Sequence, residues 1–238
     1  MGAAQVKIPE PIVLIPGLNC TPALYAPQWP ALASGRQILI AETTADDTIA
    51  AMVERLLAAA PERFALCGLS MGGYVAFEVM RRAPERVTRL ALLDTTAKPP
   101  TPETNAPREQ MIALAEKGAF DNVVTVLWQK LVAPGRLADE ALRLDVKAMA
   151  EAVGVAGFIR QQRAIMGRSD ARPVLGAISV PALVVVGAED AITPPDEARE
   201  IAAGIGAKAR YLEVPGCGHL STLEAPEIVT AALLAWLG

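Results

Sequence analysis

The chain has 238 residues, of which 52% are hydrophobic, 20% charged and 4% aromatic, and its formal net charge is −4. This length and composition are typical of one globular α/β unit with a large core. Acidic and basic residues are mixed along the chain, which excludes the basic surface of a nucleic-acid-binding protein. No stretch approaches the ~18 consecutive apolar residues of a membrane span. We therefore expect neither nucleic acid nor a membrane as a partner.

Six short, mostly apolar runs predict β-strands, and this composition is typical of strands covered on both faces. These runs are residues 11–15, 36–40, 63–67, 87–94, 181–187 and 209–214. Apolar residues at helical spacing predict helices between them, at residues 46–60, 71–83, 195–204 and 225–237. Strands that alternate with helices predict an α/β fold with a mostly parallel, doubly wound sheet.

The alternation stops once, between the fourth and fifth predicted strands. From residue 97 to residue 172 only helical patterns occur, at residues 104–117, 119–131, 137–151 and 153–166. We call residues 97–172 the lid, because an insertion at this point is expected to lie over the carboxyl edge of the sheet. Residues 1–96 and 173–238 are expected to form the core. A peripheral helical layer without a gating role is the alternative.

The segment FALCGLSMGGYVAFEVMRRAP, residues 64–84, places a serine between a predicted strand and a predicted helix. Gly68 and Gly72 flank Ser70 in the pattern G-x-S-x-G, which forms a nucleophile elbow where it joins a strand to a helix. Glycine at these positions lets the strand and the helix pass closely. The pentapeptide alone also fits an ordinary turn, but its strand–turn–helix context indicates that Ser70 is a nucleophile.

A serine hydroxyl is a poor nucleophile until a base accepts its proton. The one histidine of the chain, His219, follows the last predicted strand and is the candidate base. Asp190 follows the strand at residues 181–187 and is the candidate acid that orients the imidazole. The resulting chain order, Ser…Asp…His, is that of one class of serine hydrolases. Asp94, at the end of the fourth strand, is the alternative acid.

Several segments together resemble the α/β-hydrolase fold family, in the form of its small, lidded, esterase-like members. They are PIVLIPGLN, FALCGLSMGGYVAFE, RLALLDTTA, RPVLGAISVPALVVVGAEDAITPP and VPGCGHLSTLEAPE. The resemblance implies an oxyanion hole formed by the backbone N–H groups of Met71 and Leu18. Many members have His-Gly where this chain has Pro16-Gly17. Many also have two further strands before the first one here, so the resemblance implies a sheet trimmed at that edge.

The apolar side chains of the lid can form its own core or line a pocket. We select Trp128, Phe120 and Phe158 as candidate substrate-binding residues, which would favour an apolar acyl or alcohol group. Four arginines lie near the end of the lid, at positions Arg160, Arg163, Arg168 and Arg172. A solvated helix face is expected there, and binding of an acidic substrate or an acyl-carrier partner is the alternative.

The odd number of cysteines indicates a reducing compartment, because it does not suit a disulfide framework. With no secretory pattern at the start of the sequence, we expect a cytoplasmic protein. Cys20, Cys67 and Cys217 lack the C-x-x-C spacing of a zinc site and are expected to be small buried hydrophobes. No phosphate-binding or other cofactor motif occurs, so we expect neither a cofactor nor a metal.

These features predict a serine hydrolase that cleaves a small to medium carboxylic ester through an acyl-enzyme. The same triad could instead serve carbon–carbon bond hydrolysis, enol-lactone opening, perhydrolysis or acyl transfer. A non-catalytic ligand-binding protein is a further alternative. The sequence leaves the substrate and the oligomeric state open.

Overall fold

The computed structural model describes residues 9–238, which form one six-stranded sheet in which every neighbouring pair is parallel. The strand order is β2-β1-β3-β4-β5-β6. The strands are β1 (Ile12–Ile15), β2 (Ile38–Ile40), β3 (Phe64–Leu69), β4 (Val87–Leu93), β5 (Ala182–Gly187) and β6 (Ala209–Val214). The doubly wound α/β prediction is confirmed. Residues 1–8, which precede the first strand, lie outside the described residues.

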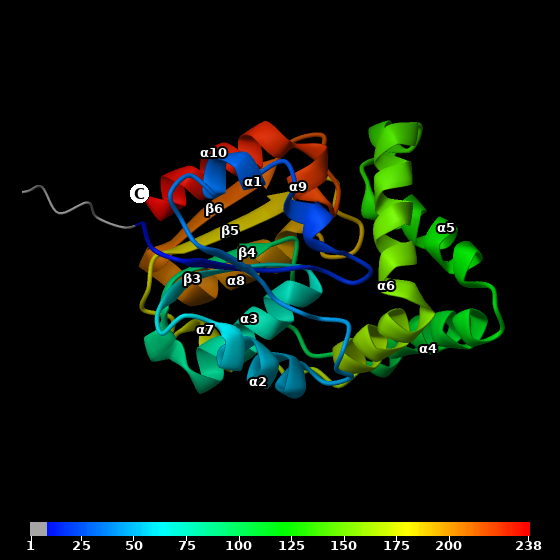
Figure 1. The fold of residues 1–238 in the computed structure, drawn as a ribbon, viewed down its shortest axis with the longest axis horizontal. Helices are drawn as coiled ribbons and strands as arrows, with labels where there is room; N and C mark the ends of the chain where they lie inside the picture. Colours follow the sequence, from blue (N-terminus) through cyan, green and yellow to red (C-terminus); the bar gives the residue numbers. More distant parts are fainter. Residues whose placement is uncertain (1–8) are drawn as a thin grey trace, which may run out of the picture.

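Helices cover both faces of the sheet (Figure 1). One face is covered by α2 (Ile49–Ala59), α3 (Met71–Arg82), α7 (Arg172–Leu175) and α8 (Pro195–Ile205). The other face is covered by α1 (Trp29–Leu32) and α10 (Pro226–Leu237), which is preceded by the short α9 (Ser221–Glu224). Short 3₁₀ turns at residues 22–25, 84–86, 134–136 and 206–208 complete the connections.

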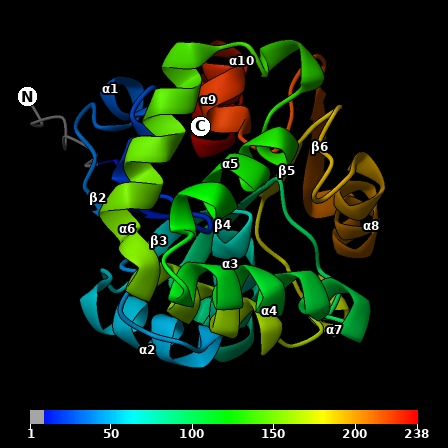
Figure 2. The ribbon, with the colours of Figure 1, turned by 90° about the vertical axis from the view of Figure 1, so that its right-hand side faces the viewer.

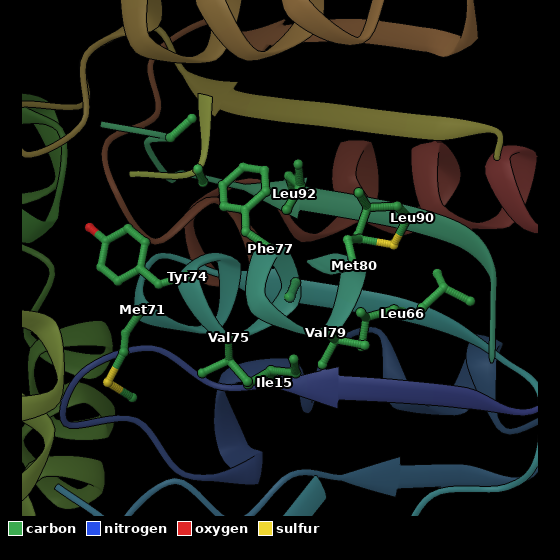
Figure 3. Packing of buried hydrophobic residues seen from close by; sticks show 14 of the residues in the cluster. Ile15, Leu66, Met71, Tyr74, Val75, Phe77, Val79, Met80, Leu90 and Leu92 are labelled. Carbon is green, nitrogen blue, oxygen red and sulfur yellow. The ribbon is translucent and has the colours of Figure 1, made fainter. Parts of the chain in front are cut away.

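Two covered faces explain why the strands are apolar nearly throughout. Successive side chains of a strand point to opposite faces, so Val13 and Ile15 pack beneath α2 and α3, whereas Ile12 and Leu14 pack against α1 and α10. All of β1, β3 and β5 is buried. Figure 3 shows α3 on the first of these faces, with Phe77 and Met80 directed towards strands β3 and β4. A polar residue on either face of these strands would be desolvated.

The lid contributes three long helices between β4 and β5: α4 (Pro102–Glu116), α5 (Phe120–Leu131) and α6 (Glu140–Met166). They pack on one another and stand beyond the carboxyl edge of the sheet (Figures 1 and 2). Gly154 has φ 68° and ψ 171°, which interrupts α6 close to the gap between the two helices predicted there. The domain boundaries at residues 96 and 173 stay a prediction. Within residues 9–238, no helix combines the length and apolar character needed to cross a membrane.

Strand β3 and helix α3, which Ser70 connects, pack so closely that their backbones are in direct contact. A Cβ atom added to Gly68 would overlap the carbonyl oxygen of Gly72, and one added to Gly72 would overlap the carbonyl of Ile15. Glycine is therefore required on steric grounds at both positions. This close contact holds Ser70, in the turn between β3 and α3, at the end of the sheet.

We expect Gly68→Ala to lower the melting temperature by about 2–12 °C, because overpacking against fixed backbone costs ~1–3 kcal/mol. Gly135→Ala is the matched control, since a Cβ there meets nothing within 4 Å. Thermal unfolding followed by circular dichroism measures both variants. Equal melting temperatures for the two would show that the crossing can relax.

Candidate active site

Ser70 occupies the turn between β3 and α3 in an unusual backbone conformation. Its φ of 55° and ψ of −114° are rare for a residue with a side chain. Such strain persists only when the surroundings hold it. Here the Ser70 N–H donates to the Leu93 carbonyl at 2.9 Å, and the Ser70 carbonyl accepts from Gly73 N–H and from Thr95 Oγ1, both at 2.8 Å. These bonds fix the serine with its side chain at the surface of a pocket.

His219 lies within hydrogen-bond distance of that serine. The distance from Ser70 Oγ to His219 Nε2 is 2.8 Å, and the imidazole is buried apart from the pocket it lines. The histidine follows β6 on a loop whose position is fixed by the lid, because the His219 N–H donates to the carbonyl of Leu131 at 2.9 Å. The loop after β6 therefore brings together two residues that are 149 positions apart.

Asp190 contacts the other ring nitrogen of His219. Its Oδ2 is 2.7 Å from His219 Nδ1. Its oxygens also accept from the backbone N–H groups of Ile192 and Thr193, at 2.8 and 2.9 Å, and from Thr193 Oγ1 at 2.9 Å. A carboxylate held in this way can accept a hydrogen bond from Nδ1–H, which leaves Nε2 unprotonated and able to accept the proton of Ser70.

Asp94, the alternative acid, lies in the same region but makes different contacts. It is fully buried at the end of β4, and its carboxylate accepts from the N–H groups of Gly187 and Ser221 at 3.1 and 3.2 Å. Burial and the nearby charge of Asp190 raise the pKa of Asp94 to about 8. The geometry therefore places Asp190, and not Asp94, on the imidazole, while Asp94 ties together the loops that carry Asp190 and His219.

The surroundings of His219 favour its protonated form. Burial by itself lowers the pKa of the imidazole, but the charge and hydrogen bond of Asp190, with the charges of Asp94 and Glu224, outweigh burial and raise it above the ordinary value of 6.5. For Asp190, burial raises the pKa, whereas His219 and the N–H donors lower it, and the net effect is a lowered pKa. The acid is therefore ionised at neutral pH and can stabilise an imidazolium.

The two backbone N–H groups for which the resemblance implied an oxyanion role belong to Met71 and Leu18. Met71 begins α3, so its N–H has no acceptor within the helix, and Leu18 lies in the turn after β1 and lines the pocket. Among residues 9–238, neither amide donates an intramolecular hydrogen bond. The lid fixes the Leu18 turn, because Asn19 N–H donates to Oε1 of the buried Gln161 at 2.9 Å. The oxyanion role of the two amides stays a prediction.

Ser70 and His219 open into a pocket of about 450 Å³ between the core and the lid. The lid contributes most of its apolar wall, through Met111, Leu114, Val126, Leu127 and Leu131. A mostly apolar pocket with a few convergent polar groups is typical of small-molecule sites.

The structure corrects the expectation that Trp128, Phe120 and Phe158 line this pocket. The rings of Phe120 and Phe158 lie 5.3 Å apart in the core of the lid, and Trp128 is buried with its Nε1 donating to the carbonyl of Leu137 at 3.4 Å. The lid needs a core of its own, and aromatic side chains bury the most area there. Met111 and Leu127 pack on that core and present the pocket wall instead.

Glu224 is a buried residue of the site that the sequence did not single out. Its carboxylate accepts from the N–H groups of Gly218 and Leu220, both at 3.1 Å, and of Ala133 at 2.8 Å. One side chain therefore joins both sides of His219 to the end of α5. The available signal was an acid in the mostly apolar segment between the histidine and the final helix, only five positions after His219.

The remaining candidates have structural surroundings. All three cysteines are buried and unpaired; burial raises the pKa of the Cys20 and Cys67 thiols to about 12 and that of Cys217 higher still. Residues 9–238 contain no cluster of three or more potential metal ligands. Three of the four lid arginines have separate partners: Arg160 donates to the Thr44 carbonyl, Arg172 pairs with Asp170, and Arg168 stacks on the ring of Tyr74. Arg163 is exposed.

The pattern of an apolar parallel sheet, a strained serine after β3 and a His–Asp pair after later strands defines the α/β-hydrolase class. The sequence profile of the alpha/beta hydrolase fold family matches residues 10–226, and the chain belongs to this family. It is a hydrolase by this membership, in agreement with the prediction from its motifs.

Named relatives show how wide the family is. A Mycobacterium tuberculosis protein with the provisional name non-heme bromoperoxidase BpoC is 31% identical over 207 residues, which cover 81% of this chain and 73% of that protein. An esterase from Thermogutta terrifontis has a similar structure, with a TM-score of 0.86, 26% identity and coverage of 96% and 89% of the two chains. The enol-lactonase from Burkholderia xenovorans LB400 has a TM-score of 0.83 and 25% sequence identity, and the match covers 96% of this chain and 91% of that one.

The raised pKa of His219 predicts a pH profile. Only neutral imidazole accepts the serine proton, so kcat/KM should rise with pH through a midpoint above 6.5. Asp190→Asn removes the main charge that raises this pKa, so the midpoint should move to lower pH while kcat/KM falls by ~10³- to 10⁴-fold. Asp94→Asn should lower kcat/KM much less than Asp190→Asn does. The measurement is hydrolysis of p-nitrophenyl acetate between pH 5 and 9, and a wild-type midpoint below 6.5 would contradict the assignment.

Glu224→Gln tests whether the carboxylate positions the histidine loop. An amide group would turn one acceptor into a donor facing backbone N–H groups, so we expect the melting temperature to fall by about 2–12 °C and kcat/KM by about 10- to 100-fold. Glu227→Gln, at an exposed position of α10, removes the same charge and is the control. Identical kinetics and stability in the two variants would refute the role.

Proposed function

We propose that the protein is a serine hydrolase that cleaves a carboxylic ester through an acyl-enzyme, with Ser70, His219 and Asp190 as its catalytic triad. One observation carries the proposal: Ser70 Oγ, the imidazole and Asp190 Oδ2 form a continuous hydrogen-bonded chain with distances of 2.8 and 2.7 Å at the wall of the pocket. This is the geometry that general-base activation of a hydroxyl requires.

In the first half-reaction, Ser70 Oγ attacks the ester carbonyl carbon while His219 Nε2 accepts the hydroxyl proton. The oxygen of the tetrahedral intermediate becomes negative and would accept hydrogen bonds from the N–H groups of Leu18 and Met71. His219 then transfers the proton to the leaving alkoxide, and the acyl group stays on the serine. Asp190 remains ionised and stabilises the imidazolium throughout.

In the second half-reaction, water replaces the alcohol. His219 accepts a proton from the water, the hydroxide attacks the acyl carbon, and the same proton returns to Ser70 Oγ when the acid leaves. The two backbone amides would serve both tetrahedral intermediates, because the carbonyl oxygen keeps its position. No cofactor or metal enters this scheme.

Opening of an enol-lactone is the second candidate, and the similarity to a solved enol-lactonase is the observation that favours it. An enol-lactone is an internal ester, so the same nucleophile, base and oxyanion donors would serve. A panel of p-nitrophenyl esters of increasing acyl length, measured beside an enol-lactone, distinguishes the two substrate classes.

A cytoplasmic location stays a prediction.

Ser70→Ala should fold like the wild type and lose ester hydrolysis by about 10⁴-fold or more, because the nucleophile is gone. A fluorophosphonate probe should label the wild type and not the variant. Intact mass spectrometry measures the labelling. Labelling of Ser70→Ala, or retention of a tenth of the wild-type rate, would refute the nucleophile, and an unlabelled wild type would favour a non-catalytic binding protein.

A further inference from the structure

The pocket that contains Ser70 and His219 also contains a cation with no carboxylate partner. Arg108, on α4 of the lid, lines this pocket and is largely covered by its neighbours. Among residues 9–238, no Asp or Glu oxygen lies within 4.0 Å of its guanidinium. The arginines on the outer faces of α3, α6 and α8 differ, since Arg81, Arg82, Arg143 and Arg199 all pair with acids.

The hydrogen bonds of Arg108 satisfy only part of its guanidinium. Its Nη1 donates to Oε1 of the buried Gln162 at 2.7 Å, and its Nε is buried without an acceptor. Its Nη2 makes no intramolecular hydrogen bond with the described residues and is not among their fully buried atoms. A charged group that is partly desolvated and short of acceptors is costly for the fold, so it calls for a compensating function.

The neighbours of Arg108 add positive charge and no negative charge. The guanidinium of Arg168 lies 4.5 Å from the centre of the Tyr74 ring, and Tyr74 lines the pocket beside Arg108. Figure 3 shows the Tyr74 hydroxyl extending away from the core packing of α3, on the same side as Met71. The pKa of Arg108 is lowered by its burial and by the charge of Arg168, although the Tyr74 hydroxyl acts in the opposite direction.

The described pocket wall as a whole is positive. Besides the catalytic pair it includes Arg108 and Lys130, and it includes no Asp or Glu. A guanidinium offers two parallel N–H donors to a carboxylate, which suits it to bind that group in particular. An apolar wall with one such cation would accommodate a short hydrocarbon chain that ends in an acid group.

We propose that Arg108 binds a second, free carboxylate of the substrate, so that the preferred ester is a half-ester of a dicarboxylic acid or an ester of a hydroxy acid. This proposal rests on the proposed ester hydrolysis for its reaction, but its binding group, Arg108, lies outside the triad and can be tested separately. Arg108 is a specificity-determining residue and takes no part in the bond-breaking steps.

The test compares matched substrates that differ only in the distal group. The p-nitrophenyl half-ester of adipic acid is measured against the corresponding monoamide, in which a neutral amide replaces the carboxylate. The acetate ester of 4-hydroxybutyrate against its amide tests the alcohol side. Wild type should prefer the acid by about 10- to 100-fold in kcat/KM within at least one pair, the range expected for a charge-assisted hydrogen bond. Equal rates for acid and amide in both pairs would overturn the proposal without any variant.

Arg108→Gln should remove this preference and leave hydrolysis of the neutral amide substrates within about threefold of wild type, because the catalytic atoms are untouched. Arg108→Lys keeps the positive charge but lacks the two parallel N–H donors of the guanidinium, so it should retain part of the preference for the acid substrate. Arg163→Gln removes an exposed lid arginine and is the matched control that should keep the full preference. An unchanged acid-to-amide ratio in Arg108→Gln would overturn the proposal.

A binding measurement separates this proposal from the proposed reaction. Adipate should bind Ser70→Ala in calorimetry at least tenfold more tightly than it binds Ser70→Ala/Arg108→Gln, and adipamide should bind both weakly. That result would support the carboxylate site even if no ester were hydrolysed. Equal adipate affinity of the two proteins would overturn the site even if ester hydrolysis were established.

Discussion

The active site depends on the close crossing of strand β3 and helix α3. A Cβ on Gly73 would overlap the Thr95 side chain. A Cβ on Gly68 would overlap the backbone of Gly72, and a Cβ on Gly72 would overlap the carbonyl of Ile15 in β1, so α3 packs directly on the backbones of β3 and β1. This contact imposes the positive φ of Ser70 that a free chain would avoid. The cost is offset by the large apolar core on both sides of the crossing, and the result is a hydroxyl in a fixed position at the end of the sheet.

The lid covers the active site and also holds parts of it in position. Gln161 of α6 binds the turn that carries Leu18, and the carbonyl of Leu131 and the amide of Ala133 bind the His219 loop, the latter through Glu224. These are buried hydrogen bonds, and loss of one partner leaves the other unsatisfied. Movement of the lid would therefore disturb the base and the turn of the expected oxyanion hole as well as access to the pocket.

Charges of opposite sign are separated within the same site. His219 is surrounded by Asp190, Asp94 and Glu224, which together favour its protonated form. On the lid side, Arg108 and Arg168 lie without carboxylate partners in the described residues. On the proposal above, a substrate that carries one carboxylate would be attracted to the lid side and repelled by the acids, which would direct its ester towards Ser70.

The sequence by itself determined the parallel sheet, its helical lid, and the pairing of Ser70 with His219. These are encoded locally: apolar runs define the strands, the glycines around Ser70 define the crossing, and His219 is the one histidine of the chain. Only the tertiary structure decided between Asp190 and Asp94, because both end strands at the same sheet edge and their contacts depend on loop geometry. It also reversed the assignment of the lid aromatics and revealed Arg108. The reason is physical: helical spacing shows that a face is apolar, but which neighbour covers that face depends on how α4, α5 and α6 pack together.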